Sequence, residues 1–139
     1  MIIVKLSEIH KDPENLKLKD LHEIYINIEG RVTVHVNSTL YFNESFPIVE
    51  FAVALNDWLR MPEGESFKYE SMDDDDPDTF DIIAIDKKGY RLRSSWQENE
   101  CNDLLSRDIV VKFIQEYTQQ VKDAVLKQFE INLNERVGL

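Results

Sequence analysis

The sequence predicts an α+β domain, with a mainly antiparallel sheet of about five to six strands and two helices at about 47–60 and 103–130. Two observations predict this class. Apolar residues alternate with period two in several segments joined by short turns, which is typical of half-buried antiparallel strands. In two longer segments they recur every three or four residues, as on one face of a helix. A chain of 139 residues has the usual size of one unit, so we expect 1–139 to form a single domain.

Three strands are expected before the first helix. Leu21–Glu29 alternates apolar and polar residues, with His22 on the inward side, and Arg31–Asn37 alternates in the same way. Because Gly30 tolerates the positive φ of a tight turn, these two segments are predicted to pair as a hairpin. Ser7–Lys19 is polar and is predicted to be a loop. The remaining expected strand is Ile2–Leu6, and Thr39–Phe42 is interpreted as a short continuation after Asn37.

The segment Phe46–Arg60 is predicted to be the first helix. Pro47 suits the first turn of a helix, where its missing N–H is not needed. The apolar positions that share one face are Ile48, Phe51, Ala52, Leu55, Trp58 and Leu59. A helix with so broad an apolar face must pack on a large surface, and the sheet is the obvious candidate.

Three strands are expected after this helix, namely Ser66–Ser71, Phe80–Asp86 and Tyr90–Trp96. The run Ile82–Ile85 is continuously apolar, which favours a central strand covered on both faces. Arg91 and Arg93 alternate with apolar residues in the last of these strands, so their side chains are expected on its solvent face.

The final helix is predicted to begin near Asn102 or Ser106, either of which can cap a helix N-terminus, and to end near Glu130. Its apolar stripe consists of Ile109, Val110, Phe113, Ile114, Tyr117, Val121, Ala124 and Val125. Polar residues cover much of the opposite side, so this helix is expected to pack one face on the sheet.

The most distinctive stretch is Glu63–Asp81, which holds nine acidic residues and one lysine, a net charge of −8. The whole chain has a formal net charge of −11, so the remaining 120 residues carry only −3. Asp73–Asp78 cannot form a strand interior, because adjacent like charges repel and Pro77 lacks a backbone donor. We therefore expect a solvated acidic loop that either attracts a basic protein or keeps the protein soluble.

Composition excludes several classes of function. A net charge of −11 disfavours binding to nucleic acid and to anionic membranes, because both need clustered Lys and Arg. No apolar run approaches the roughly 18 residues that span a bilayer, and the first residues lack a signal-peptide pattern. A single cysteine, Cys101, excludes an internal disulfide framework. We expect a cytoplasmic protein that binds neither nucleic acid nor membrane.

The sequence contains no catalytic or cofactor-binding signature. His10, His22 and His35 have no ligand-like spacing among themselves or with Cys101. No histidine lies near Cys101 in the sequence to act as its base, so an incidental thiol is favoured over a nucleophile. We predict a protein that is not an enzyme and that has no metal or cofactor.

Two acidic patterns fail on spacing. The run Asp73–Asp78 lacks the glycine and the terminal acid of a calcium-binding loop. Asp78 and Asp86 resemble the acids in the P-D…D-x-K core of a nuclease superfamily, but a strand between them separates them by roughly 26 Å, at about 3.3 Å per residue. They cannot share one metal ion, so nuclease activity is not expected.

The predicted partner-binding residues are Glu70, Asp73, Asp74, Asp75, Asp76, Asp78, Asp81, Arg91 and Arg93. Two interpretations of the arginines remain open. They neutralise the acidic loop within the protein, or they bind an acidic group on a partner. Trp58 and Trp96 are expected in the core, and either would serve as an interface anchor if exposed.

A weak family pattern extends over roughly residues 20–130. It consists of an F-x-Y-x-S strand (Phe67, Tyr69, Ser71), an S-x-W strand end (Ser94, Trp96) and a long C-terminal helix. A small acidic protein with these features resembles immunity proteins of bacterial polymorphic-toxin and contact-dependent inhibition systems. The resemblance implies binding to a cognate toxin domain, often a nuclease with a basic cleft, and occlusion of its active site. The alternatives are a protein–protein adaptor or complex subunit, and an enzyme with an unrecognised site.

Overall fold

The computed structural model describes residues 1–11, 17, 20–69 and 79–139. It confirms the α+β class: this part of the chain forms two antiparallel three-stranded sheets and four helices. The first sheet has the order β1 (Ile2–Lys11), β2 (Ile28–Val36), β3 (Thr39–Pro47), and the second β4 (Phe67–Lys68), β5 (Asp81–Ile85), β6 (Gly89–Arg93). The helices are α1 (Leu21–Asn27), α2 (Ile48–Leu59), α3 (Arg107–Phe129) and α4 (Leu133–Val137).

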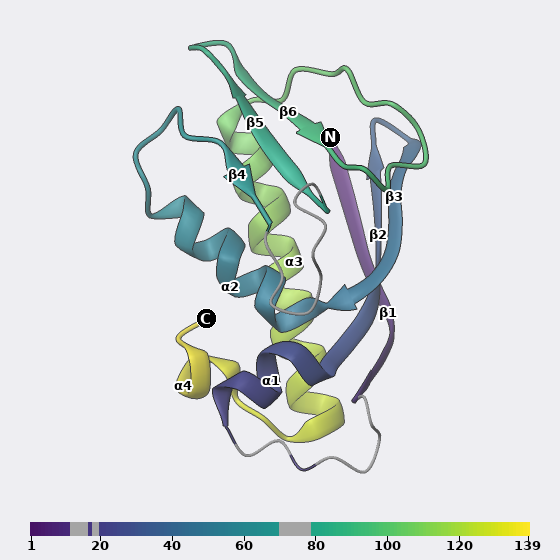
Figure 1. Cartoon of the computed structure of the whole chain (residues 1–139), viewed down its shortest axis with the longest axis vertical. Coiled ribbons are helices and arrows are strands. Elements are labelled where there is room, and N and C mark those ends of the chain that lie inside the picture. Colours follow the sequence, from purple (N-terminus) through teal and green to yellow (C-terminus); the bar gives the residue numbers. More distant parts are fainter. Residues whose placement is uncertain (12–16, 18–19, 70–78) are drawn as a thin grey trace.

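Helix α3 runs along the length of the molecule, with the first sheet on one side and α2 on the other (Figure 1). Ser106 caps its N-terminus, since the side-chain oxygen accepts from the backbone N–H of Ile109. The hydroxyl group of Tyr117 donates to the carbonyl oxygen of Ile48 at 2.7 Å, which fixes α3 against the start of α2. The predicted long helix is thus confirmed, and Ser106 rather than Asn102 is its cap.

The first strand is longer than predicted. Strand β1 continues to Lys11 and pairs with β2 over most of that length, so the predicted loop does not begin at Ser7. A register shift between Ser7 and His10 places Glu8 at a φ of 51°, which marks a bulge in the strand. The apolar residues of Ile2–Leu6 predicted the first half of the strand. The second half was missed because its residues are mostly polar.

The predicted hairpin around Gly30 is wrong, because residues 21–27 form helix α1. Asp20 caps this helix by accepting a hydrogen bond from the N–H of Glu23 at 2.9 Å. Ile24 and Ile28 are both fully buried, and their spacing of four suits a helix as well as a strand. His22, predicted to point inward, is exposed.

Gly30 lies inside β2 instead of at a turn. A Cβ atom there would lie 3.1 Å from Cγ1 of Ile9 and 3.2 Å from Cγ2 of Ile48. The missing side chain therefore allows β1 and α2 to approach β2 closely, so glycine serves packing here and not a positive φ.

Helix α2 is confirmed, with Pro47 as its cap residue, and it supplies the aromatic residue that joins the two sheets. The ring of Phe51 is fully buried. Its centroid lies 5.0 Å from that of Phe46 on β3, 6.1 Å from Phe67 on β4 and 5.3 Å from Phe80, which directly precedes β5. One hydrophobic cluster thus spans both sheets.

The second sheet differs from its prediction on one face. Strand β5 is central, as predicted, but it is not covered on both faces. Ile82 is fully buried, whereas Ile83 and Ile85 on the other face are only half-buried. Two backbone hydrogen bonds close the outer edge of β6, from the N–H of Tyr90 to the oxygen of Leu105 and from the N–H of Leu105 to the oxygen of Tyr90.

Candidate functional site

The predicted partner-binding residues divide into two groups. Asp81, Arg91 and Arg93 lie on the two neighbouring strands β5 and β6. The acidic residues that lie outside the described part of the chain are Glu70, Asp73, Asp74, Asp75, Asp76 and Asp78. The described part of the candidate site consists of one face of the second sheet and the two residues that flank the acidic segment 70–78.

Asp81 and Arg93 form an ion pair across the two strands. They are direct partners in the β5–β6 register, and Nη2 of Arg93 lies 2.9 Å from Oδ2 of Asp81. The aspartate side chain is fully buried, while about half of the arginine side chain (51%) is exposed. Of the two interpretations of the arginines, internal neutralisation holds for this pair, and Asp81 does not lie on the outer surface.

Arg91 has a different environment. It is exposed and pairs in register with Ile83, and no ion pair joins it to any described residue. The open face of the second sheet is defined here as Ile83, Ile85, Arg91 and Gln97, which line one cavity of about 270 Å³. Apolar side chains beside a guanidinium group without an ion pair suit contact with a protein. Such a partner would offer a carboxylate to Arg91 and apolar atoms to Ile83 and Ile85.

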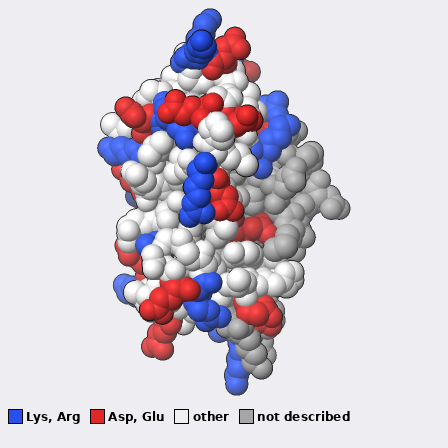
Figure 2. Space-filling view, turned by 90° about the vertical axis from the view of Figure 1, so that its left-hand side faces the viewer, with Lys and Arg blue, Asp and Glu red and all other residues white. Residues whose placement is uncertain are grey.

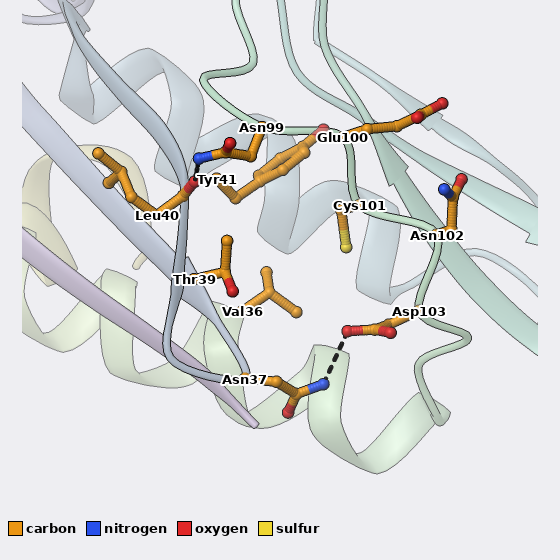
Figure 3. A pocket seen from close by; sticks show the side chains of 10 residues that line it. All are labelled: Val36, Asn37, Thr39, Leu40, Tyr41, Asn99, Glu100, Cys101, Asn102 and Asp103. Carbon is orange, nitrogen blue, oxygen red and sulfur yellow. Dashed lines mark hydrogen bonds between the residues drawn. The ribbon is translucent and has the colours of Figure 1, made fainter.

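A second cavity, of about 350 Å³, lies between the β2–β3 hairpin and the loop 99–103 (Figure 3). Two side-chain hydrogen bonds hold the loop in place: Nδ2 of Asn99 donates to the oxygen of Leu40, and Nδ2 of Asn37 donates to Oδ2 of Asp103, both at 2.8 Å. Figure 3 shows the thiol of Cys101 pointing into this space.

The groups around this loop are poorly suited to catalysis. Burial raises the pKa of the Cys101 thiol, which favours the protonated form over the nucleophilic thiolate. Burial also raises the pKa of the Tyr41 hydroxyl far above its usual range, so that phenol stays neutral. Within the described residues, no group of three or more histidine, cysteine or acidic side chains could hold a metal ion.

The acidic segment leaves the fold from two buried residues that lie side by side. The backbone N–H of Tyr69 donates to the oxygen of Phe80 at 3.1 Å, and both residues are fully buried. The hydroxyl of Tyr69 donates to Oε1 of Glu50 at 2.6 Å, and Oγ of Ser94 donates to the carbonyl of Thr79. Both ends of the segment are therefore fixed to the core, next to β5.

One face of the molecule, seen in Figure 2, has mixed charge. On the face that Figure 2 shows, acidic and basic side chains are interspersed, with no large patch of one sign. This face therefore offers no second concentration of one charge to compare with the acidic segment.

Sequence reasoning identified Arg91 and Arg93 but missed the loop that borders them. Glu100, Cys101 and Asn102 line both cavities, on either side of that loop. The run of acidic and amide residues between the last strand and the last helix was the available signal. Both tryptophans were predicted to lie in the core. Trp58 does so, with an exposure of 3%, whereas Trp96 is only half-buried.

In the described part of the chain, no helix is both long enough and apolar enough to cross a membrane. The comparison with curated proteins gave no match, and neither did the comparison with solved structures. A family model described as a domain of unknown function, DUF7878, matches residues 4–127. That range contains the second sheet, all but the first two residues of the first sheet, helices α1 and α2 and most of α3. The chain therefore belongs to the DUF7878 family.

Proposed function

We propose that this protein is a non-enzymatic immunity or inhibitor protein, which acts in the cytoplasm and neutralises a cognate bacterial toxin domain. The partner is basic, and binding occludes its active site. The observation that carries the proposal is the attachment of the acidic segment. Residues 70–78 have a net charge of −6, and their flanking residues Tyr69 and Thr79 are buried at the start of β5, the strand that carries Ile83 and Ile85.

Electrostatics supplies the first step of binding. A toxin that cleaves nucleic acid needs a positive cleft for the phosphates, and a concentrated negative charge competes for that cleft. Attraction between the two surfaces raises the association rate and orients the encounter, more than it strengthens the final complex. Because the segment is attached at a fixed place on the fold, the encounter also brings the toxin to the open face.

The open sheet face supplies the second step. Ile83 and Ile85 are half-buried and offer apolar area to a partner. Arg91 is exposed beside them and pairs with a carboxylate at the rim of the basic cleft. Burial of the apolar atoms and of this charge pair slows dissociation, which is where most differences in affinity between related complexes arise.

The environment of Cys101 supports a binding function over catalysis. Its thiol has a raised pKa, and no hydrogen bond joins it to a histidine within the described residues. An inhibitor that occludes an active site needs only a surface complementary to the toxin. The acidic segment, held at both ends, and the partly apolar sheet face would provide such a surface.

The test is co-expression with toxin domains encoded beside this gene. We expect the protein to rescue growth and to copurify with one of them. The variant in which Asp73, Asp74, Asp75 and Asp76 are all changed to Asn should associate more slowly, chiefly at low salt. Its melting temperature should stay the same or rise, because a self-repelling run is removed.

A matched control removes four exposed acids elsewhere, with Asp57→Asn, Asp123→Asn, Glu130→Gln and Glu135→Gln. The association rate of this variant should stay closer to that of the wild type. Equal slowing in both variants would show that total charge acts instead of the segment. If no adjacent toxin binds and a non-toxic protein copurifies in stoichiometric amount, the protein is an adaptor and the proposal fails.

A further inference from the structure

A third cavity, of about 360 Å³, lies beside the β5–β6 turn and the start of α3. Three segments line it: the connection between α2 and β4 at Glu63 and Gly64, the β5–β6 turn at Lys87 and Lys88, and the start of α3 at Arg107. These residues are far apart in the sequence, so sequence analysis did not group them. None of them belongs to the proposed partner surface.

Arg107 is held rigidly in the wall of this cavity. Its guanidinium carbon lies 4.8 Å from the centroid of the Trp58 ring and 5.7 Å from that of Tyr90. Its Nη1 donates to the hydroxyl oxygen of Tyr90 at 3.0 Å. No other described residue accepts from it, so most of its N–H donors remain available. Stacking on aromatic rings orients such a fork of donors before a ligand arrives.

Tyr90 adds a buried donor to the same wall. Its exposure is 5%, and its hydroxyl oxygen accepts hydrogen bonds from Nη1 of Arg107 and, at 3.4 Å, from the N–H of Gly64. With both acceptor positions occupied, the hydroxyl group can only donate further. Within the described residues the Tyr90 proton has no acceptor. Because Tyr90 lines the cavity, this proton is available to a ligand there.

The remaining side chains make the lining positive. Lys87 and Lys88 are exposed and form no ion pair with any described residue. With Arg107 they provide three positive charges, against the two carboxylates of Glu63 and Asp86. This cavity thus has a net charge of +1 within a chain whose net charge is −11.

We propose that this cavity binds a small phosphate ester. Four side chains from two sides of the cavity, the two lysines, Arg107 and Tyr90, present donors to it. A phosphate group offers more oxygen acceptors than a carboxylate, and Arg matches its geometry with two parallel hydrogen bonds. Ser106 already caps the N-terminus of α3, so side chains supply the contacts to the ligand. The ligand occupies a site separate from the toxin-binding surface.

The test uses inorganic phosphate as the probe and follows backbone and Tyr90 resonances by NMR at constant ionic strength. Phosphate should produce saturable shifts at residues 63–64, 86–90 and 106–107. Lys87→Gln combined with Lys88→Gln should weaken binding at least roughly tenfold, since two charge-assisted contacts are lost. Tyr90→Phe keeps the ring under Arg107 and should weaken binding severalfold.

Lys112→Gln is the matched control, because Lys112 is an exposed lysine on α3 that lies outside the cavity. Its phosphate affinity should equal that of the wild type. Equal weakening in this control, or unchanged binding in the Lys87 and Lys88 double variant, would overturn the proposal. An equal response to acetate at the same ionic strength would show a general anion effect and would also overturn it.

Discussion

The two sheets of this protein differ in strand length, in how their edges are held and in how much apolar surface they expose. The first has strands of 10, 9 and 9 residues, and the second has strands of 2, 5 and 5. In the first, α3 closes the outer edge of β1: Oε1 of Gln120 accepts from the N–H of Leu6, and its Nε2 donates to the oxygen of Val4. In the second, an apolar face stays half open. The first sheet thus has longer strands and an edge held by α3, whereas the second keeps Ile83, Ile85 and Arg91 available for contact.

The two sheets nevertheless depend on one aromatic cluster. Phe51 of α2 contacts rings from β3 and from both sides of the acidic segment. Unfolding of one sheet should therefore weaken the other, despite their difference in closure.

The largest expected effect comes from Phe51→Ala. Removing a fully buried ring from the junction should lower the free energy of unfolding by about 3–5 kcal/mol. Urea denaturation gives the size of the loss, and hydrogen exchange shows where it falls. Faster exchange should appear in both sheets. Protection lost only in β4–β6 would mean that the first sheet folds independently of this contact.

A pair of glycine substitutions compares the two sheets directly. A Cβ atom on Gly89 would lie 2.6 Å from the backbone oxygen of Leu105, at a φ of +135°. On Gly30 its two nearest neighbours would be side-chain carbons at 3.1 and 3.2 Å, which can move, and the nearest backbone atom, the oxygen of Ser7, lies at an ordinary contact distance of 3.4 Å. We expect Gly89→Ala to cost about 3 kcal/mol and Gly30→Ala about 1 kcal/mol, measured by thermal unfolding. The reverse order would show that the first sheet tolerates less strain than the second.

The seal on β1 can be tested with Gln120→Ala. This change removes two hydrogen bonds from backbone groups at a strand edge, for a loss of about 1–2 kcal/mol. The amide of Leu6 should exchange faster, because its acceptor is gone. Gln119→Ala is the control, since Gln119 is exposed and, among the residues that the structure describes, its side chain bonds only to Asp123 on its own helix. An equal effect of the two changes would mean that the amide contacts contribute nothing to the edge.

The smallest effect on stability is expected for Arg91→Gln on the open face. Its side chain is exposed and has no ion pair in the described part of the chain, so unfolding free energy should change by less than about 0.5 kcal/mol. Chemical denaturation measures this directly. A loss comparable to that of Gln120→Ala would show that the second sheet relies on this arginine for its own structure.

The sequence was most informative where a periodic pattern was long. Helices α2 and α3 were predicted because their apolar stripes extend over several turns, and the solvent-facing side of Arg91 and Arg93 followed from simple alternation. Helix α1 was missed because seven residues do not separate a period of two from a spacing of four. The division into two sheets depends on tertiary packing around Phe51, which no local pattern encodes.

The candidate sites divide in the same way. The sequence alone shows the concentration of acidic residues between Glu63 and Asp81. It does not show that Tyr69 and Thr79 fix the ends of the acidic segment to the core. The stacking of Arg107 on Trp58 and Tyr90 joins residues 17 or more positions apart, so it could not be read from spacing. The sequence did not show which arginine pairs with Asp81. The register of β5 and β6 decides this, because it places Arg93 opposite Asp81 and Arg91 opposite Ile83.

The adjacency of Tyr69 and Phe80 has a consequence for how this family can diverge. When the two ends of a segment are already held together, each doubling of its length adds only about 0.6 kcal/mol of closure entropy. Insertions, deletions and charge changes between these positions therefore cost the fold little. A family member with a longer or shorter stretch here is therefore expected to keep the packing around Phe51 unchanged.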